Sequence, residues 1–209
     1  MAKQHVVQQG EHISVIARQN GFFRFETIWD HPANAKLKAL RQNPNVLHPG
    51  DVVTIPDKQQ KTAPAATGRA HKFRVDAQLL ELHVVLRDVN GDPLPGIECE
   101  LEIDGVVQKL TTDGAGKIDR AIPVPAKAGK LRARGEEFLL AIGHLDPVEE
   151  ESGLRARLAN LGYYLASESA LDEEELRSAI EEFQVEHGLR VTGVADAATR
   201  ASIKKSHGS

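Results

Sequence analysis

The two stretches that decide the fold of the C-terminal part of the chain are Leu154-Arg-Ala-Arg-Leu-Ala-Asn-Leu-Gly-Tyr163 and Ala179-Ile-Glu-Glu-Phe-Gln-Val-Glu-His-Gly-Leu189. In the first stretch, Leu154, Leu158 and Leu161 recur at spacings of four and three residues, so they share one helix face. The first stretch therefore predicts an amphipathic helix.

The second stretch continues an apolar stripe that begins further upstream. Leu176, Ile180 and Phe183 lie at helical spacing and form the expected buried face. Asp172 is suited to cap the N-terminus of this helix, and Glu175 three residues later completes a capping box. Residues 149–209 therefore predict a small helical domain.

Together with the run Thr192-Gly-Val-Ala-Asp-Ala-Ala-Thr199, the two stretches resemble the three-helix peptidoglycan-binding domain that occurs beside many wall hydrolases. The order and spacing of the three motifs match over almost all of 152–205. The resemblance implies a three-helix bundle that binds peptidoglycan.

Residues 1–57 predict a compact unit with a β-α-α-β order. Ile13, Ile16 and Ala17 share one face of the first helix, and Leu37 and Leu40 are expected to face inward from the second. The expected elements are a strand at 4–8, helices at 12–19 and 32–41, and a closing strand at 51–55.

The opening Val6-Val-Gln-Gln-Gly-Glu-His-Ile-Ser-Val-Ile-Ala17 and the closing Asn43-Pro-Asn-Val-Leu-His-Pro-Gly-Asp-Val-Val-Thr-Ile-Pro56 resemble the two ends of a LysM domain. That family holds N-acetylglucosamine chains between the loop after its first strand and the loop before its last. The alternative is that these loops only close the fold. The matching positions, taken as candidate glycan-binding residues, are Gly10, Glu11, His12 and Ile13, with Asn45, Val46, Leu47 and His48.

Trp29 lies in a middle segment that is longer than the LysM family shows. As the single tryptophan of the chain, it either stacks on sugar or a protein partner, or fills the core. The sequence leaves these alternatives open.

Residues 75–148 predict short antiparallel strands that form a small β-sandwich. Ile97-Glu-Cys-Glu-Leu-Glu-Ile-Asp104 alternates strictly between apolar and acidic residues, which predicts a half-buried strand. Cys99 then faces the core as an inert thiol, while Glu98, Glu100 and Glu102 form an acidic outer face that is a candidate partner-binding surface. The turns at 89–96 and 112–116, with Ile122-Pro123, resemble transthyretin-like and carboxypeptidase-regulatory-like domains.

Residues 58–74 predict a flexible linker between the first two units. The segment lacks large apolar residues up to position 72, so it cannot offset its ordering entropy by burial. It contains no acidic residue and five basic ones. A solvated spacer and a contact for an acidic partner are both compatible with this composition. The fold class expected for the whole chain is therefore α+β and multidomain.

The sequence offers no catalytic or metal motif. It contains one cysteine, no His-Glu-x-x-His and no Gly-x-Ser-x-Gly. The sequence therefore does not support the hypothesis of a zinc hydrolase or of a serine hydrolase. The net charge of −4 argues against nucleic-acid binding, and no apolar run is long enough to span a membrane. We expect a non-enzyme without cofactors or metals.

Two functions remain open. The first is a non-catalytic, wall-targeting protein that binds peptidoglycan glycan chains. The second is an adaptor of a type VI secretion or contractile injection spike, with a spike protein or co-encoded toxin as partner; the order of the three units is similar to such accessory proteins. The first ten residues lack an apolar stretch, so we expect synthesis in the cytoplasm without a signal peptide. Either periplasmic residence or delivery by a secretion apparatus would follow.

Overall fold

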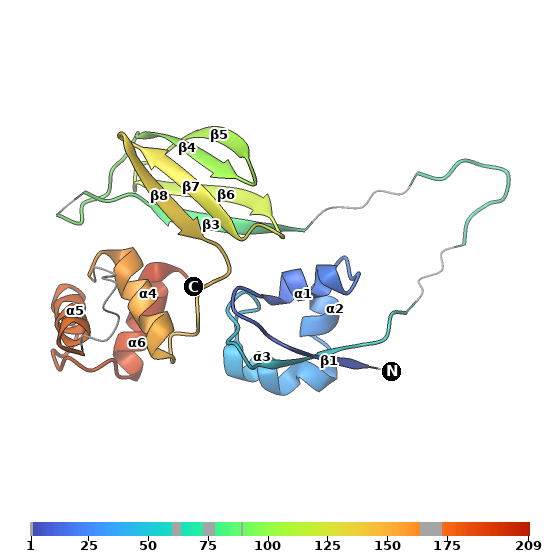
Figure 1. Cartoon of the computed structure of the whole chain (residues 1–209), viewed down its shortest axis with the longest axis horizontal. Coiled ribbons are helices and arrows are strands. Elements are labelled where there is room, and N and C mark those ends of the chain that lie inside the picture. The colour runs from blue at the N-terminus through green and yellow to red at the C-terminus, as the bar shows by residue number, and fades with distance from the viewer. Residues whose placement is uncertain (1, 60–63, 73–77, 89, 164–172) are drawn as a thin grey trace.

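The computed structural model describes residues 2–59, 64–72, 78–88, 90–163 and 173–209 (Figure 1). The predicted cap at Asp172 and parts of the predicted linker 58–74 lie outside these residues. Helices and antiparallel sheets are both present, so the α+β fold class is confirmed. The described side chains form three separate hydrophobic clusters, one in each part of the chain.

The N-terminal cluster lies between a two-stranded sheet and short helices. β1 (Lys3–Val6) pairs antiparallel with β2 (Val52–Ile55). Between them the chain forms α1 (Ile13–Gln19), α2 (Glu26–Trp29), the 3-10 helix η1 (Pro32–Asn34) and α3 (Ala35–Arg41). The predicted β-α-α-β order is present, and α2 is the extra element that the longer middle segment contributes.

One buried amide ties this extra segment to the sheet. Asn34 Nδ2 donates to the carbonyl oxygens of Ile28 and Thr54 at 2.8 and 2.7 Å, and Thr54 N donates back to Asn34 Oδ1 at 2.8 Å. Leu37 is buried as expected, whereas Leu40 is 64% exposed. The prediction for Leu40 was wrong because α3 is only seven residues long and buries a single residue against the core.

The middle part of the chain has two antiparallel sheets that share one core. β3 (Leu79–Val85) pairs with β6 (Lys117–Pro123). The second sheet has the order β5-β4-β7-β8, formed by β4 (Glu98–Ile103), β5 (Val106–Thr111), β7 (Ala128–Ala133) and β8 (Glu136–Ala141). Cys99 is 3% exposed in this core. Burial raises the pKa of its thiol, which confirms an unreactive core position.

The C-terminal cluster is built by three helices, α4 (Glu151–Leu161), α5 (Glu173–Glu186) and α6 (Ala197–His207). Leu158, Phe183 and Ile203 are fully buried, one from each helix. Asp196 caps α6, because its Oδ1 accepts from Thr199 N at 2.8 Å. The expected helical domain is therefore present.

The segment between β8 and α4 runs close to the first turn of α4. A Cβ on Gly153 would lie 2.0 Å from the Pro147 carbonyl oxygen and 2.4 Å from that of Asp146. Both neighbours are backbone atoms, so they cannot move aside as a side chain would. Gly153 is therefore required for this approach.

We predict that Gly153→Ala destabilises the helical domain by roughly 2 kcal/mol, the usual cost of forcing a methyl group into packed structure. Urea denaturation followed through the NMR signals of α4 amides measures this. Gly114→Ala is the matched control, because the space around Gly114 is open. Equal stability of the two variants would contradict the packing argument.

Candidate functional site

The residues predicted to bind glycan lie on two loops that the structure brings together. Ile13 N donates to the carbonyl oxygen of Pro44 at 3.0 Å, which joins the loop before α1 to the loop before β2. Asn45 is exposed, and Gly10, Glu11 and His48 are half-buried. The other four residues are buried: His12, Ile13, Val46 and Leu47.

Several of these residues are committed to contacts within the N-terminal unit. Ile13 and Leu47 belong to its core, so their side chains offer nothing to a ligand. Glu11 Oε2 lies 2.6 Å from His5 Nε2 and accepts from Gln8 N at 3.0 Å.

The loop before β2 is held by a charged pair. Asp51 accepts from His48 N at 2.9 Å and binds Arg41 through both carboxylate oxygens at 2.8 and 2.9 Å. The hydrogen bond to Asp51 also raises the pKa of the Arg41 guanidinium. This bidentate geometry fixes the loop on which Asn45 and Val46 stand.

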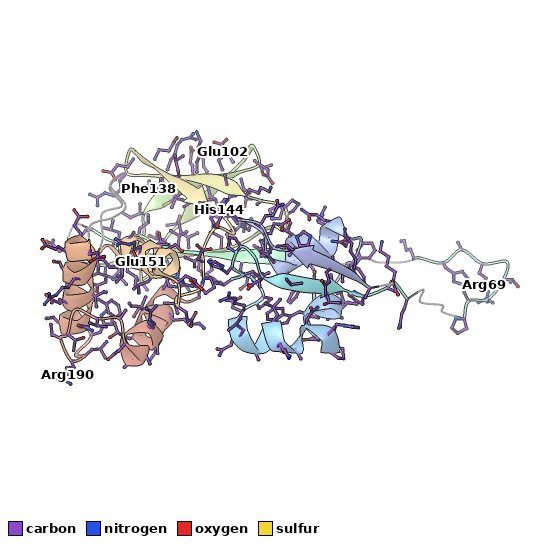
Figure 2. All side chains as sticks on the ribbon, turned by 60° about the horizontal axis from the view of Figure 1, so that its bottom comes forward. Arg69, Glu102, Phe138, His144, Glu151 and Arg190 are labelled. Atoms are coloured by element: carbon purple, nitrogen blue, oxygen red, sulfur yellow. The ribbon has the colours of Figure 1, made fainter. Side chains whose placement is uncertain are left out.

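A distant part of the chain covers the first loop. Gln9 Nε2 donates to the carbonyl oxygen of His144 at 3.3 Å. A Cβ on Gly10 would lie 3.0 Å from the His144 ring, and one on Gly143 would lie 3.1 Å from the Gly10 carbonyl oxygen. Figure 2 shows His144 between the middle sheets and the N-terminal unit. The predicted glycan loops are therefore in contact with the chain itself.

His12 lies beneath this covering segment. It is 2% exposed, and neither ring nitrogen has a hydrogen-bond partner among the described residues. Burial lowers its pKa to about 4, so the ring is neutral at neutral pH. A buried polar ring without partners is costly, on the order of 1–3 kcal/mol.

Trp29, the first of the candidate partner-binding residues, lies inside the N-terminal unit. Trp29 is 4% exposed and packs in the N-terminal core, so the partner-binding alternative is corrected to a core role. Because η1 and α2 fold back on β2, the Trp29 ring is enclosed in the core and is not exposed to a partner.

Glu98, Glu100 and Glu102 stand on the outer face of the four-stranded sheet, as the alternation predicted (Figure 2 labels Glu102). Cations from the flanking strands oppose two of them. Lys109 Nζ lies 3.9 Å from Glu100, and Arg132 lies 3.4 Å from Glu102. The face is therefore mixed in charge. A shallow hollow of about 480 Å³ opens at one end of it, between Glu98 and Arg134.

In the helical domain, a residue that the sequence did not single out organises the loop between α5 and α6. Gln184 is fully buried. The two N–H groups of its Nε2 are shared among three acceptors: Thr192 Oγ1 at 3.2 Å, and the Val194 carbonyl oxygen and Thr199 Oγ1 at 3.0 Å each. Its Oε1 accepts from the backbone amides of Thr192 and Gly193 at 2.7 and 3.1 Å. One amide side chain thus fixes the whole loop.

The loop that Gln184 fixes presents apolar side chains to solvent. Val191 and Val194 are 51% and 62% exposed. Arg190 beside them lies at the end of the domain that points away from the N-terminal unit (Figure 2). A loop that is fixed in this way and exposes methyl groups suits a ligand that has apolar groups.

An aromatic cluster lies at the same, C-terminal end of α5. The His187 ring stacks on Phe183 with centroids 3.9 Å apart, and Tyr163 meets Phe183 edge-on at 5.3 Å. Tyr163 donates its hydroxyl to Glu186 Oε2 at 2.5 Å. Burial, and then Glu186, raises the pKa of Tyr163. This cluster is structural, because its polar atoms bond within the domain: His187 Nδ1 lies 3.0 Å from the Phe183 carbonyl oxygen, and His187 Nε2 lies 3.1 Å from Ser206 Oγ.

Among the described residues, no group of three His, Cys, Asp or Glu side chains is placed to hold a metal ion. None of the helices in the described part of the chain is long and apolar enough to cross a membrane.

Residues 152–203 match the family model of a putative peptidoglycan binding domain. The match covers the region from the start of α4 into α6, which includes Gln184 and the loop that it holds. It supports peptidoglycan binding by the C-terminal helical domain. No curated protein and no solved structure matches the chain significantly.

We predict that Gln184→Leu destabilises the helical domain by roughly 3 kcal/mol, because the hydrogen bonds of the buried side chain are lost and the backbone amides of Thr192 and Gly193 lose their acceptor. Hydrogen exchange should accelerate first at Thr192 and Gly193. Ser178→Leu, on an exposed position of α5, serves as control. Unchanged exchange at the two loop amides would show that Gln184 does not hold the loop.

A second prediction concerns acid. Asn160 Nδ2 lies 3.0 Å from His207 Nε2, and Ser209 Oγ lies 2.8 Å from Nδ1. Burial, and then the charge of Arg157, lowers the pKa of His207 from 6.5 to about 4. The unfolded chain therefore binds this proton at higher pH than the folded chain, so stability is full above pH 6.5 and is lost as the pH falls towards 4.

We expect His207 to contribute on the order of 1–2 kcal/mol to this loss. Urea denaturation at pH 7 and pH 4.5, followed through the NMR signals of α6 amides, measures it. His207→Asn should flatten the pH dependence in that interval. An identical pH dependence in the variant would assign the loss to other groups.

Proposed function

We propose that this protein is a non-catalytic peptidoglycan-binding protein, whose C-terminal helical domain attaches it to the bacterial cell wall. The observation that carries the proposal is the match over 152–203, together with an intact three-helix core in the same residues. The non-catalytic part rests on the absence of hydrolase motifs from the sequence.

Within this domain we assign the wall contact to the α5–α6 loop. The loop is rigid, because Gln184 satisfies its backbone, and little ordering entropy is then lost on binding. Its exposed Val191 and Val194 fit methyl groups of the N-acetyl and lactyl substituents of peptidoglycan.

The proposal extends to the N-terminal unit as a glycan-binding module for N-acetylglucosamine chains. Its support is the LysM-like order of elements and the pairing of the two loops that carry Gly10 and Asn45. Asn45 is exposed, while His12 holds polar atoms that lack partners. Both are suitable contacts for sugar hydroxyl and acetamido groups.

An alternative function is that of an interaction adaptor in a type VI secretion or contractile injection spike, with a spike protein or toxin as partner. The observation that favours it is the contact of the glycan loops with residues 143–144, since a LysM-like unit that serves as a structural joint would be covered in this way. If this adaptor hypothesis holds, retention of the protein on the cell wall would be weak.

We predict that the wild-type protein is retained on insoluble peptidoglycan, and that Val191→Asp with Val194→Asp reduces retention roughly fivefold to tenfold. Two exposed valines that become partly buried on contact contribute about 1–1.5 kcal/mol in total. Val106→Asp, at 59% exposure on β5, is the control for surface charge.

The same incubation tests catalysis. No soluble muropeptides should appear in the supernatant, with or without added zinc. Absence of retention by the folded wild-type protein would reject wall binding in favour of the adaptor function, and release of muropeptides would reject the non-catalytic assignment.

A further inference from the structure

The segment between β8 and α4 crosses the surface of the N-terminal unit at a point where each of the two segments in contact has a glycine. Gly10 and Gly143 have φ angles of 81° and 79°, a conformation that other residues rarely adopt. A Cβ on Gly143 would lie 3.1 Å from the Gly10 carbonyl oxygen and 3.2 Å from His12 Cδ2. The two backbones thus approach more closely than side chains would allow.

The second loop is covered by the continuation of the same segment. Val46 is 7% exposed although it does not belong to the N-terminal core cluster. It lines a crevice of about 10 Å³ with Pro147 and Val148 of this segment and with Arg157 and Lys204 of the helical domain, which leaves room for at most about one water molecule. Residues 143–148, here called the latch segment, therefore lie on both loops at once.

Among the described residues, the polar contacts between this region and the loops are long. Gln9 donates to the His144 carbonyl oxygen at 3.3 Å, and just beyond the latch segment Glu150 forms an ion pair of 4.0 Å with Arg41. A surface ion pair of this length contributes little. The covered His12 ring keeps two nitrogen atoms without partners, which costs free energy in the closed state only. In the closed arrangement the backbones pack closely, but few hydrogen bonds compensate for the polar groups that are buried there.

We propose that the latch segment is a detachable intramolecular lid, and that the surface beneath it, formed by Gly10, His12 and Val46, is a ligand surface for N-acetylglucosamine chains that opens when the lid leaves. This inference rests on the proposed glycan function of the N-terminal unit. It adds that the unit is closed in the free protein and that His12 becomes accessible to sugar only when the lid leaves.

The chemistry of the covered surface fits such a ligand. An N-acetylglucosamine unit offers hydroxyl and amide groups as hydrogen-bond partners for the His12 ring, and its acetamido methyl group could occupy the apolar surroundings that Val46 now shares with Pro147 in the crevice. Glu11, the nearest carboxylate on the loop, is already paired with His5. A neutral ligand therefore suits the surface better than a charged one.

The opening is linked to the helical domain through the far end of the lid. Arg200 Nη1 donates to the Val148 carbonyl oxygen, and Arg157 Nη1 donates to that of Asp146 at 2.7 Å. The lid thus remains attached to α4 and α6 when it leaves the N-terminal unit. Opening moves the N-terminal unit relative to the helical domain without unfolding either.

The test uses the full chain and two lid variants. Gly143→Val places a branched side chain against Gly10 and His12, and His144→Ala removes the ring that packs on Gly10. Gly135→Val is the matched control, because Gly135 has the same type of backbone conformation, with φ 86°, in open space. The probe is the hexamer of β-1,4-linked N-acetylglucosamine, with affinity measured by calorimetry.

We expect the hexamer to bind Gly143→Val at least tenfold more tightly than the wild type, with a smaller gain for His144→Ala and none for Gly135→Val. NMR titration of the His12 ring gives an independent measure of opening, since its pKa should rise towards the free imidazole value in the lid variants. His12→Ala added to Gly143→Val should remove most of the gain.

Three outcomes would overturn the inference. If the wild type binds the hexamer as tightly as the lid variants while His12 stays buried, the segment is not a lid, although glycan binding itself stands. If the His12 pKa rises and no variant binds the hexamer, the covered surface is not a glycan surface. If Gly143→Val leaves the His12 pKa unchanged, the segment does not detach. Retention on peptidoglycan through residues 152–203 is unaffected by each of these.

Discussion

The hydrogen bond from Arg157 to the Asp146 carbonyl oxygen is the contact on which the arrangement of this protein depends. Arg157 is 1% exposed and also donates to the Gly153 carbonyl oxygen at 2.8 Å. Burial lowers its pKa to about 10, so the guanidinium stays protonated at neutral pH. A buried cation of this kind is stable only while backbone oxygens compensate it, and the segment between β8 and α4 supplies one of them.

This constraint sets the path of the chain between its parts. Because Gly153 has no side chain, residues 146–147 can lie directly on the first turn of α4, and Arg200 holds Val148 from α6. The preceding residues, Gly143 and His144, are then directed onto the loop before α1. Gln78 makes a second contact with the N-terminal unit, where its side chain bonds Phe25 N and Glu26 at 3.2 and 3.1 Å. The position of the N-terminal unit therefore follows from loops rather than from packed helices.

The parts of the fold that the sequence predicted are those encoded in local periodicity. Leu158 and Phe183 are buried as helical spacing required, and Cys99 faces the core as strict alternation required. The wrong prediction for Leu40 came from a helix too short to bury two residues. The mixed charge around Glu100 was not predicted, because it depends on the register that brings Lys109 and Arg132 to opposite sides of β4.

The candidate site was predictable only in part for a similar reason. Motif matches placed the loops of Gly10 and Asn45 correctly beside each other, and the family match confirms the type of the C-terminal domain. The covering of His12 by Gly143 joins residues more than a hundred positions apart, and no local pattern encodes such a contact. The role of Gln184 could not be predicted either. In the sequence it is a single polar residue of an amphipathic helix, and its hydrogen bonds form only when the loop folds back over it.

The two proposed binding surfaces differ in accessibility, and this difference has a thermodynamic consequence. The α5–α6 loop is exposed in the closed protein, so the helical domain can bind the wall first. Once it is bound, the N-terminal unit is held near glycan chains at an effective concentration on the order of millimolar. A lid held by two weak polar contacts is displaced at such a concentration but not in dilute solution. On the proposed function, the same connecting segment that positions the units would therefore restrict glycan binding by the N-terminal unit to protein already attached to the wall.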